Sequence, residues 1–160
     1  MDMKIERIWA MPNKWTFTIK PIKELLVKEM VGYSCDPFAG KNSPASETND
    51  LTEEVAMHHL DALEFLGNQA TGIYDTVLYD PPYSITQARK YGSKKYASMK
   101  YWKQCKDEIA RILKPGGKVI CFGWSSMGLG KNRGFRMERI LLVPHGGSKN
   151  DTIVTVEIKL

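Results

Sequence analysis

The sequence predicts an α/β fold with a mostly parallel sheet and a C-terminal antiparallel hairpin. Apolar runs typical of buried strands alternate along the chain with stretches of helical apolar spacing. Near the C-terminus, two strand-like runs are separated by a glycine-containing turn, which is typical of a hairpin. The 160 residues are 42% hydrophobic and 26% charged, which predicts one globular domain over residues 1–160.

The first half of the chain supplies one clear helix. Residues 21–30 begin with a proline suited to the first helical turn and carry an apolar stripe at helical spacing. Residues 31–36 read as a short strand, followed by a turn at 37–40 and a loop over 41–50. Residues 60–66 predict a short helix.

The second half has stronger signals. The run 74–79 predicts a buried strand, which ends at two prolines because proline cannot continue a strand ladder. Residues 101–113 have helical spacing and are followed by a continuous apolar strand over 118–123. Two further strands, 135–144 and 151–160, form the expected hairpin. In such sheets ligands bind beyond the carboxyl ends of the strands, where residues 36–40 and 80–83 fall.

The net charge of +5, from 23 basic and 18 acidic residues, is unevenly placed. Residues 84–106 contain seven basic and no acidic residues, which leaves sixteen basic against eighteen acidic residues elsewhere. Basic side chains neutralise phosphates and aromatic rings stack on unpaired bases, so this segment predicts nucleic-acid binding. The alternative is a solvated loop leading into the polar face of a helix. The residues expected to bind substrate are Arg89, Lys90, Tyr91, Lys94, Lys95, Tyr96 and Lys100.

Other features exclude several classes of protein. Cys35, Cys105 and Cys121 show neither metal-site nor disulfide spacing, so we expect no metal and a reducing cytoplasm. No stretch has the roughly 18 apolar residues that span a bilayer, and none resembles a signal peptide. The three histidines have no partners in sequence and are expected at the surface or in loops. Membrane partners are not expected.

Residues Asp80, Pro81, Pro82 and Tyr83 carry the chemistry. The Asp80 carboxylate and the Pro81 carbonyl are two acceptors that a rigid turn holds in place, and Tyr83 offers a ring for stacking. Two acceptors and a ring suit an exocyclic amine on a planar heterocycle. The alternative is a strand that ends in a Pro-Pro turn.

Together with residues 36–40 (Asp-Pro-Phe-Ala-Gly), this tetrapeptide resembles the motifs of the S-adenosylmethionine-dependent amino-methyltransferases of nucleic-acid bases. The resemblance implies a Rossmann-like class I methyltransferase fold and S-adenosylmethionine as cofactor. It also implies an N-terminal arm, residues 1–20, with cofactor contacts. The implied cofactor-binding residues are Phe17, Lys20, Asp36, Pro37, Phe38, Ala39, Gly40, Asn42, Asn49, Asp50, Asp61, Ala62 and Asp80.

The sequence also departs from the family pattern. Asn42 stands where the family commonly has a second glycine. Only about ten residues separate Gly40 from Asp50, against roughly twenty in a dinucleotide-binding fold, so the intervening helix is expected to be short or absent. Either Asn49 or Asp50 is expected to meet the ribose. Phe38 fits the cofactor site and core packing equally well.

The resemblance implies methylation of adenine N6 in DNA by base flipping and direct transfer, because an aspartate at the first motif position is typical of the adenine enzymes. RNA is the second substrate choice. An inactive cofactor-binding or nucleic-acid-binding subunit of a methyltransferase complex is an alternative of another class. The chain resembles a minimal form without a target-recognition domain, and a homodimer could supply the missing surface. A role in restriction-modification or in phage fits such an enzyme.

Overall fold

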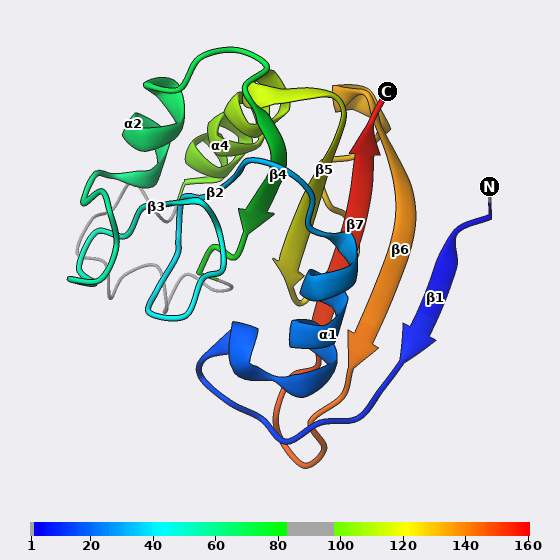
Figure 1. Ribbon diagram of the computed structural model, residues 1–160. Coiled ribbons are helices and arrows are strands. Elements are labelled where there is room, and N and C mark those ends of the chain that lie inside the picture. Colours follow the sequence, from blue (N-terminus) through cyan, green and yellow to red (C-terminus); the bar gives the residue numbers. More distant parts are fainter. Residues whose placement is uncertain (1, 83–97) are drawn as a thin grey trace.

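The computed structural model describes residues 2–82 and 98–160. Its centre is a seven-stranded sheet in the order β1-β6-β7-β5-β4-β2-β3 (Figure 1). The strands are β1 (Lys4–Arg7), β2 (Ser34–Asp36), β3 (Glu47–Thr48), β4 (Tyr74–Tyr79), β5 (Leu113–Gly123), β6 (Phe135–Val143) and β7 (Thr152–Lys159). Only β7 runs against its neighbours, so the predicted mixed sheet with a C-terminal hairpin is confirmed.

In the part of the chain that the structure describes, helices α1 (Lys20–Glu29), α2 (Ala62–Gly67) and α4 (Met99–Ile112) cover the sheet. A proline in its first turn and a buried stripe through Ile22, Leu25 and Leu26 specify α1, which packs on β5, β6 and β7. Helices α2 and α4 pack together on the opposite face (Figure 1). None of the helices in residues 2–82 and 98–160 is both long enough and apolar enough to span a membrane.

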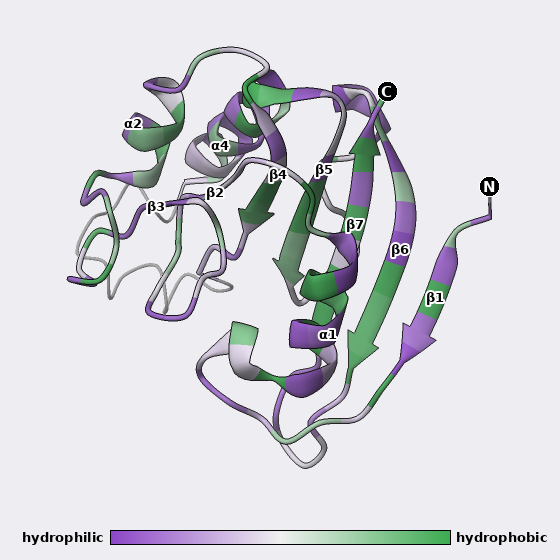
Figure 2. Ribbon diagram, viewed as in Figure 1, coloured by the Kyte–Doolittle hydropathy of each residue, from purple (hydrophilic) through white to green (hydrophobic). Residues whose placement is uncertain are grey.

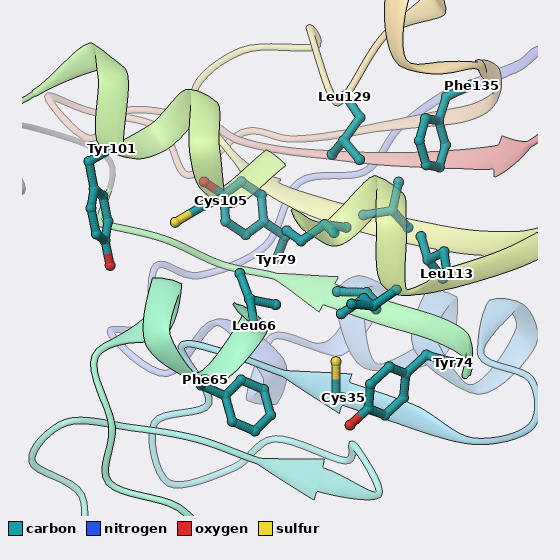
Figure 3. Packing of buried hydrophobic residues seen from close by; sticks show 14 residues of the cluster. Cys35, Phe65, Leu66, Tyr74, Tyr79, Tyr101, Cys105, Leu113, Leu129 and Phe135 are labelled. Carbon is teal, nitrogen blue, oxygen red and sulfur yellow. The ribbon is translucent and has the colours of Figure 1, made fainter. Parts of the chain in front are cut away.

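The hydrophobic core lies on both faces of the central strands. Leu78 of β4 belongs to the cluster under α1, whereas Val77 and Tyr79 belong to the cluster under α2 and α4. The second cluster also contains Phe65, Cys105, Leu113 and Leu129 among others, which Figure 3 shows between the sheet and α4. Figure 2 shows the same distribution, with hydrophobic colour concentrated on β4, β5, β6 and β7. Burial on both faces explains why β4 reads as a continuous apolar run rather than an alternating one.

Two strands of the sheet were not predicted from the sequence. β1 pairs in parallel with β6 at one edge, and the two-residue β3 pairs with β2 at the other. The interval between β2 and β3 contains no helix, as expected from its length. The strand predicted over residues 31–36 is shorter than expected, since only Ser34–Asp36 is extended.

His145 lies in the loop between β6 and β7, one of the two places expected for it, but it is buried rather than at the surface. Its side chain is only 8% exposed. The ring nitrogens lie 2.9 Å from the Ala10 carbonyl oxygen and 2.8 Å from Thr152 Oγ1, so His145 ties the chain after β1 to the start of β7. These partners are 135 and 7 residues away, and no local sequence pattern could have indicated the first of them.

Candidate active site

Three aspartates gather at the carboxyl ends of adjacent strands. Asp36 is the last residue of β2, Asp50 follows β3, and Asp80 follows β4. The three strands are neighbours and run in the same direction, so their ends meet at one edge of the sheet. The carboxylates of Asp80 and Asp50 are close enough to raise the pKa of Asp36. The site therefore concentrates negative charge in a chain whose net charge is positive.

Asp36 is the most deeply buried of the three, with no exposed surface. Its Oδ1 accepts a hydrogen bond from the Phe38 N–H at 3.0 Å, and its Oδ2 accepts one from the Ser43 hydroxyl at 2.6 Å. Burial is the largest cause of the raised pKa of Asp36, which is about 8. The hydrogen bond from Ser43 opposes this shift, and the charge of Asp80 adds to it. The smaller effects are a lowering by the Phe38 N–H and a raising by the charge of Asp50. At neutral pH Asp36 therefore holds a proton, and a cation beside it would favour its charged form.

Asp50 organises the loop between β2 and β3. Its Oδ2 accepts the Gly40 N–H at 3.0 Å, and its Oδ1 accepts the N–H groups of Thr52 and Glu53, each at 3.0 Å. Gly40 has a φ of 59°, in the left-handed region that favours glycine. The loop that replaces a helix here is thus held by a carboxylate rather than by backbone pairing alone.

Asn49, the alternative to Asp50, has a different task. Its amide nitrogen donates to the carbonyls of Pro37 at 3.1 Å and Leu60 at 2.9 Å, and its oxygen accepts the Leu60 N–H at 3.0 Å. The side chain is fully buried and its donors are used within the protein. Asp50 lines the cavity described next, whereas Asn49 does not.

A cavity of about 140 Å³ opens between the N-terminal arm and the strand ends. Its wall contains seven of the predicted cofactor-binding residues, which come from four separate parts of the chain. The lining residues are Lys14, Trp15, Thr16, Phe17, Phe38, Ala39, Gly40, Lys41, Asn42, Asp50 and Asp80.

A narrow crevice lies next to this cavity and shares Phe38 and Asp50 with it. Its lining is mostly apolar and includes Leu60, Ala62 and Pro82. Pro37, predicted to touch the cofactor, also belongs to this wall. Because the cavity wall carries both carboxylates and ammonium groups, it suits a ligand that has both a cationic and an anionic part.

Phe38 takes part in core packing and also lines the cavity. The ring is half-buried and packs against Tyr79, at a centroid distance of 6.1 Å, and against Trp102, at 5.9 Å. It also lines the cavity and the crevice. Trp102 in turn meets Tyr101 edge-on at 4.9 Å, so the site rests on an aromatic cluster that reaches into α4.

Four predicted cofactor residues lie outside the walls of the cavity and the crevice: Asp36 and Asn49, which are buried, and Asp61 and Lys20. Asp61 caps α2, where it accepts the Leu63 N–H at 3.1 Å and the Tyr101 hydroxyl at 3.2 Å. It lines a separate open hollow of about 530 Å³ between α2 and α4, together with Lys100. Lys20 is the exposed first residue of α1 and does not line the cavity.

The arm contributes residues that the sequence did not single out. Trp15 lines the cavity, and the ammonium groups of Lys14 and Lys41 lie over its ring at 4.9 and 5.3 Å from the centroid. Phe17 anchors this part of the arm, because it is buried and meets Phe122 edge-on at 5.1 Å. The pair Lys14-Trp15 was a signal in the sequence, but nothing local placed it beside residues 36–50.

Asp80, Pro81 and Pro82 are all half-buried at the mouth of the site, and Asp80 and Pro82 lie in the walls of the cavity and crevice. Tyr83 lies outside the described residues, and so do six of the predicted substrate-binding residues, Arg89, Lys90, Tyr91, Lys94, Lys95 and Tyr96. Lys100, the seventh, is exposed on the first turn of α4.

Solved structures share this fold. TrmN from Thermus thermophilus superposes with a TM-score of 0.60 at 18% identity, over 89% of this chain and 49% of that protein. The protein yhhF from Escherichia coli, a candidate methyltransferase, superposes with a TM-score of 0.56 at 13% identity, over 94% of this chain and 91% of that protein. SMU.1697c from Streptococcus mutans, a candidate methyltransferase in complex with SAH, superposes with a TM-score of 0.50 at 12% identity, over 81% of this chain and 88% of that protein.

These likenesses show that the chain has a Rossmann-like methyltransferase fold. The chain spans about half the length of TrmN. No protein-family model matches the sequence. No curated protein matches it either.

Proposed function

We propose that the chain transfers a methyl group from S-adenosylmethionine to the exocyclic N6 amino group of adenine in DNA. The observation that carries this proposal is the cluster of three aspartates at neighbouring strand ends, where Asp50 and Asp80 line a cavity and Asp36 is buried. The fold, which it shares with TrmN and yhhF, supports methyl transfer. Adenine and DNA rest on the resemblance of the motifs.

The charges of the site support this cofactor. Burial, with a smaller contribution from the Asp80 charge, raises the pKa of Asp36, and a cation beside Asp36 would favour its charged form. Asp50 lines both the cavity and the crevice, at a position suited to ribose hydroxyls. When bound, the cofactor supplies a sulfonium methyl group, the electrophile of the reaction.

The residues of the chain then position the amine. Asp80 and the Pro81 carbonyl accept hydrogen bonds from the amino group, which localises the nitrogen lone pair and directs it toward the methyl carbon. A carbon–nitrogen bond forms as the carbon–sulfur bond breaks, its electrons stay on sulfur, and the nitrogen loses a proton to Asp80 or to solvent. Neither a metal nor a cysteine is required.

The direct test is methyl transfer from radiolabelled S-adenosylmethionine to duplex DNA, single-stranded DNA and total RNA, with identification of the labelled nucleoside. Labelled N6-methyladenine from DNA supports the proposal. Labelling of RNA alone supports the second candidate, which the likeness to the tRNA methyltransferase TrmN favours. Cofactor binding without any labelling would refute the enzyme and support an inactive subunit.

Asp80→Asn tests the mechanism, with Asp75→Asn as its matched control at the opposite end of the same strand. Asp75 accepts hydrogen bonds from the Tyr33 N–H and Lys114 at the far edge of the sheet, away from the site. We expect Asp80→Asn to lower the rate at least about a hundredfold, because it removes a charged acceptor of the amine, and to retain cofactor binding. Full activity of Asp80→Asn would contradict the mechanism.

A further inference from the structure

The edge strand β1 (Lys4–Arg7) offers a surface that the proposed reaction does not use. Figure 1 places it at the opposite edge of the sheet from β3, and within the described residues it pairs only with β6. Apolar side chains are exposed along and just after it: Met3 is 44% exposed, Ile5 59%, Ile8 43% and Trp9 58%. An open strand edge with exposed apolar residues is a template for pairing with another strand.

The direction of the backbone groups identifies which residues can pair. The Ile8 N–H donates to the Leu142 carbonyl of β6, so the peptide groups of Ile8 point inward, toward β6. Alternation along the strand gives the same direction to Lys4 and Glu6, and leaves the N–H and C=O groups of Met3, Ile5 and Arg7 pointing outward. A partner strand must therefore bond to Met3, Ile5 and Arg7.

We propose that the partner is β1 of a second copy of this chain, paired antiparallel about a two-fold axis at Ile5. In this register Ile5 faces Ile5 of the second copy as a hydrogen-bonded pair, and Met3 faces Arg7 in the same way. Lys4 lies opposite Glu6 of the second copy, and Glu6 lies opposite Lys4, so both charged pairs are attractive.

The neighbouring registers are excluded by the same charges. A shift that pairs Met3 with Ile5 places Lys4 opposite Lys4, and a shift that pairs Ile5 with Arg7 places Glu6 opposite Glu6. Only the register centred on Ile5 joins outward backbone groups and opposite charges together. Charge on an edge strand usually discourages pairing, but this pattern is complementary to itself.

The dimer has a definite architecture. Two sheets join into one continuous sheet, and the two-fold axis places both copies of α1 on the same face. Since the paired β1 strands run in opposite directions, the two active sites open at opposite edges of the joined sheet. Formation of this dimer is therefore independent of the proposed methyl transfer, and each can be tested without the other.

Sedimentation velocity over a range of protein concentrations measures the dimer. Ile5→Pro removes an outward N–H and keeps the bonds of Lys4 and Glu6 to β6, so we expect a folded monomer. Lys4→Glu and Glu6→Lys each place like charges opposite each other, and each is expected to raise the dissociation constant about tenfold to a hundredfold. Lys23→Glu on the exposed surface of α1 changes the net charge as Lys4→Glu does and should leave the dimer intact.

Mixing the Lys4→Glu and Glu6→Lys chains provides the decisive result, because the mixed pair again places opposite charges together. We expect the mixture to associate although neither variant does alone, with far-ultraviolet circular dichroism confirming that each is folded. A monomeric wild-type chain would overturn the proposal, as would a dimer that Ile5→Pro leaves unchanged. Monomeric variants whose mixture fails to associate would overturn the pairing of Lys4 with Glu6.

Discussion

The buried carboxyl of Asp36 links the charge of the site to a measurable pH dependence, which Asp36→Asn isolates. Asparagine has nearly the same shape, its oxygen can accept the Phe38 N–H, and its amide can donate to the Ser43 hydroxyl. The substitution therefore preserves the local hydrogen bonds and removes only the titrating proton.

The expected magnitude follows from the raised pKa. The folded protein keeps a proton on Asp36 up to about pH 8, whereas the unfolded chain releases it near the ordinary pKa of an aspartate, 3.8. Between these values the folded state binds more protons than the unfolded state, so the free energy of unfolding falls as the pH rises. The full slope is about 1.4 kcal/mol per pH unit. The free energy of unfolding of Asp36→Asn, relative to that of the wild type, should therefore rise by about 2–3 kcal/mol between about pH 6 and about pH 8.

Urea unfolding of both proteins at several pH values measures this difference, and subtraction cancels the titration of all other groups. A stability difference that stays constant between about pH 5 and about pH 8 would refute the assignment of a raised pKa to Asp36. The same pair of proteins tests the cofactor. Because a cation favours the charged form of Asp36, affinity for S-adenosylmethionine in titration calorimetry should rise more steeply with pH in the wild type than in Asp36→Asn.

Two further predictions concern the rest of the chain. Gly128→Ala should lower the free energy of unfolding in urea by about 2–4 kcal/mol. A Cβ at this position would displace the buried carboxylate of Glu157, which accepts hydrogen bonds from the N–H groups of Leu129 and Gly130. Gly116→Ala, also at positive φ but in open space, should cost only about 1 kcal/mol, and equal losses would contradict the reasoning. Burial raises the pKa of Cys105 and Cys121 to about 12 each, so native protein at pH 8 should resist iodoacetamide in mass spectrometry, and rapid alkylation would show that these thiols are accessible.

The elements that the sequence predicts well are those whose signals are local. β4 was predicted with its observed bounds because a continuous apolar run ends at two prolines. β1 could not be predicted, since Lys4–Arg7 carries three charged side chains among four residues and exposes most of its surface. It becomes a strand because β6, more than 120 residues later, offers it an edge.

The candidate site likewise contains residues that local sequence signals identify and residues that they do not. The resemblance named Asp36, Phe38, Gly40 and Asp80 because each of the two motifs is a short run of neighbouring residues, and the structure brings the two motifs together at the strand ends. The choice between Asn49 and Asp50 depended on the direction of two adjacent side chains, which only the bonds of Asn49 to Pro37 and Leu60 decide. Trp15 and its two lysines were missed because their place in the wall depends on how the arm crosses the strand ends.

The positions of the acidic and basic side chains in the site suit the proposed reaction. Asp36, Asp50 and Asp80 lie at the strand ends, and Lys14 and Lys41 lie at the outer wall of the same cavity. A ligand with a cationic centre and a carboxylate can satisfy both groups only in one orientation, with its positive charge toward the aspartates. Methyl transfer removes one positive charge from that ligand, so Asp36 would again favour its protonated form once the reaction is complete. The buried carboxyl of Asp36 would thereby favour release of the neutral sulfur product over release of the cationic methyl donor.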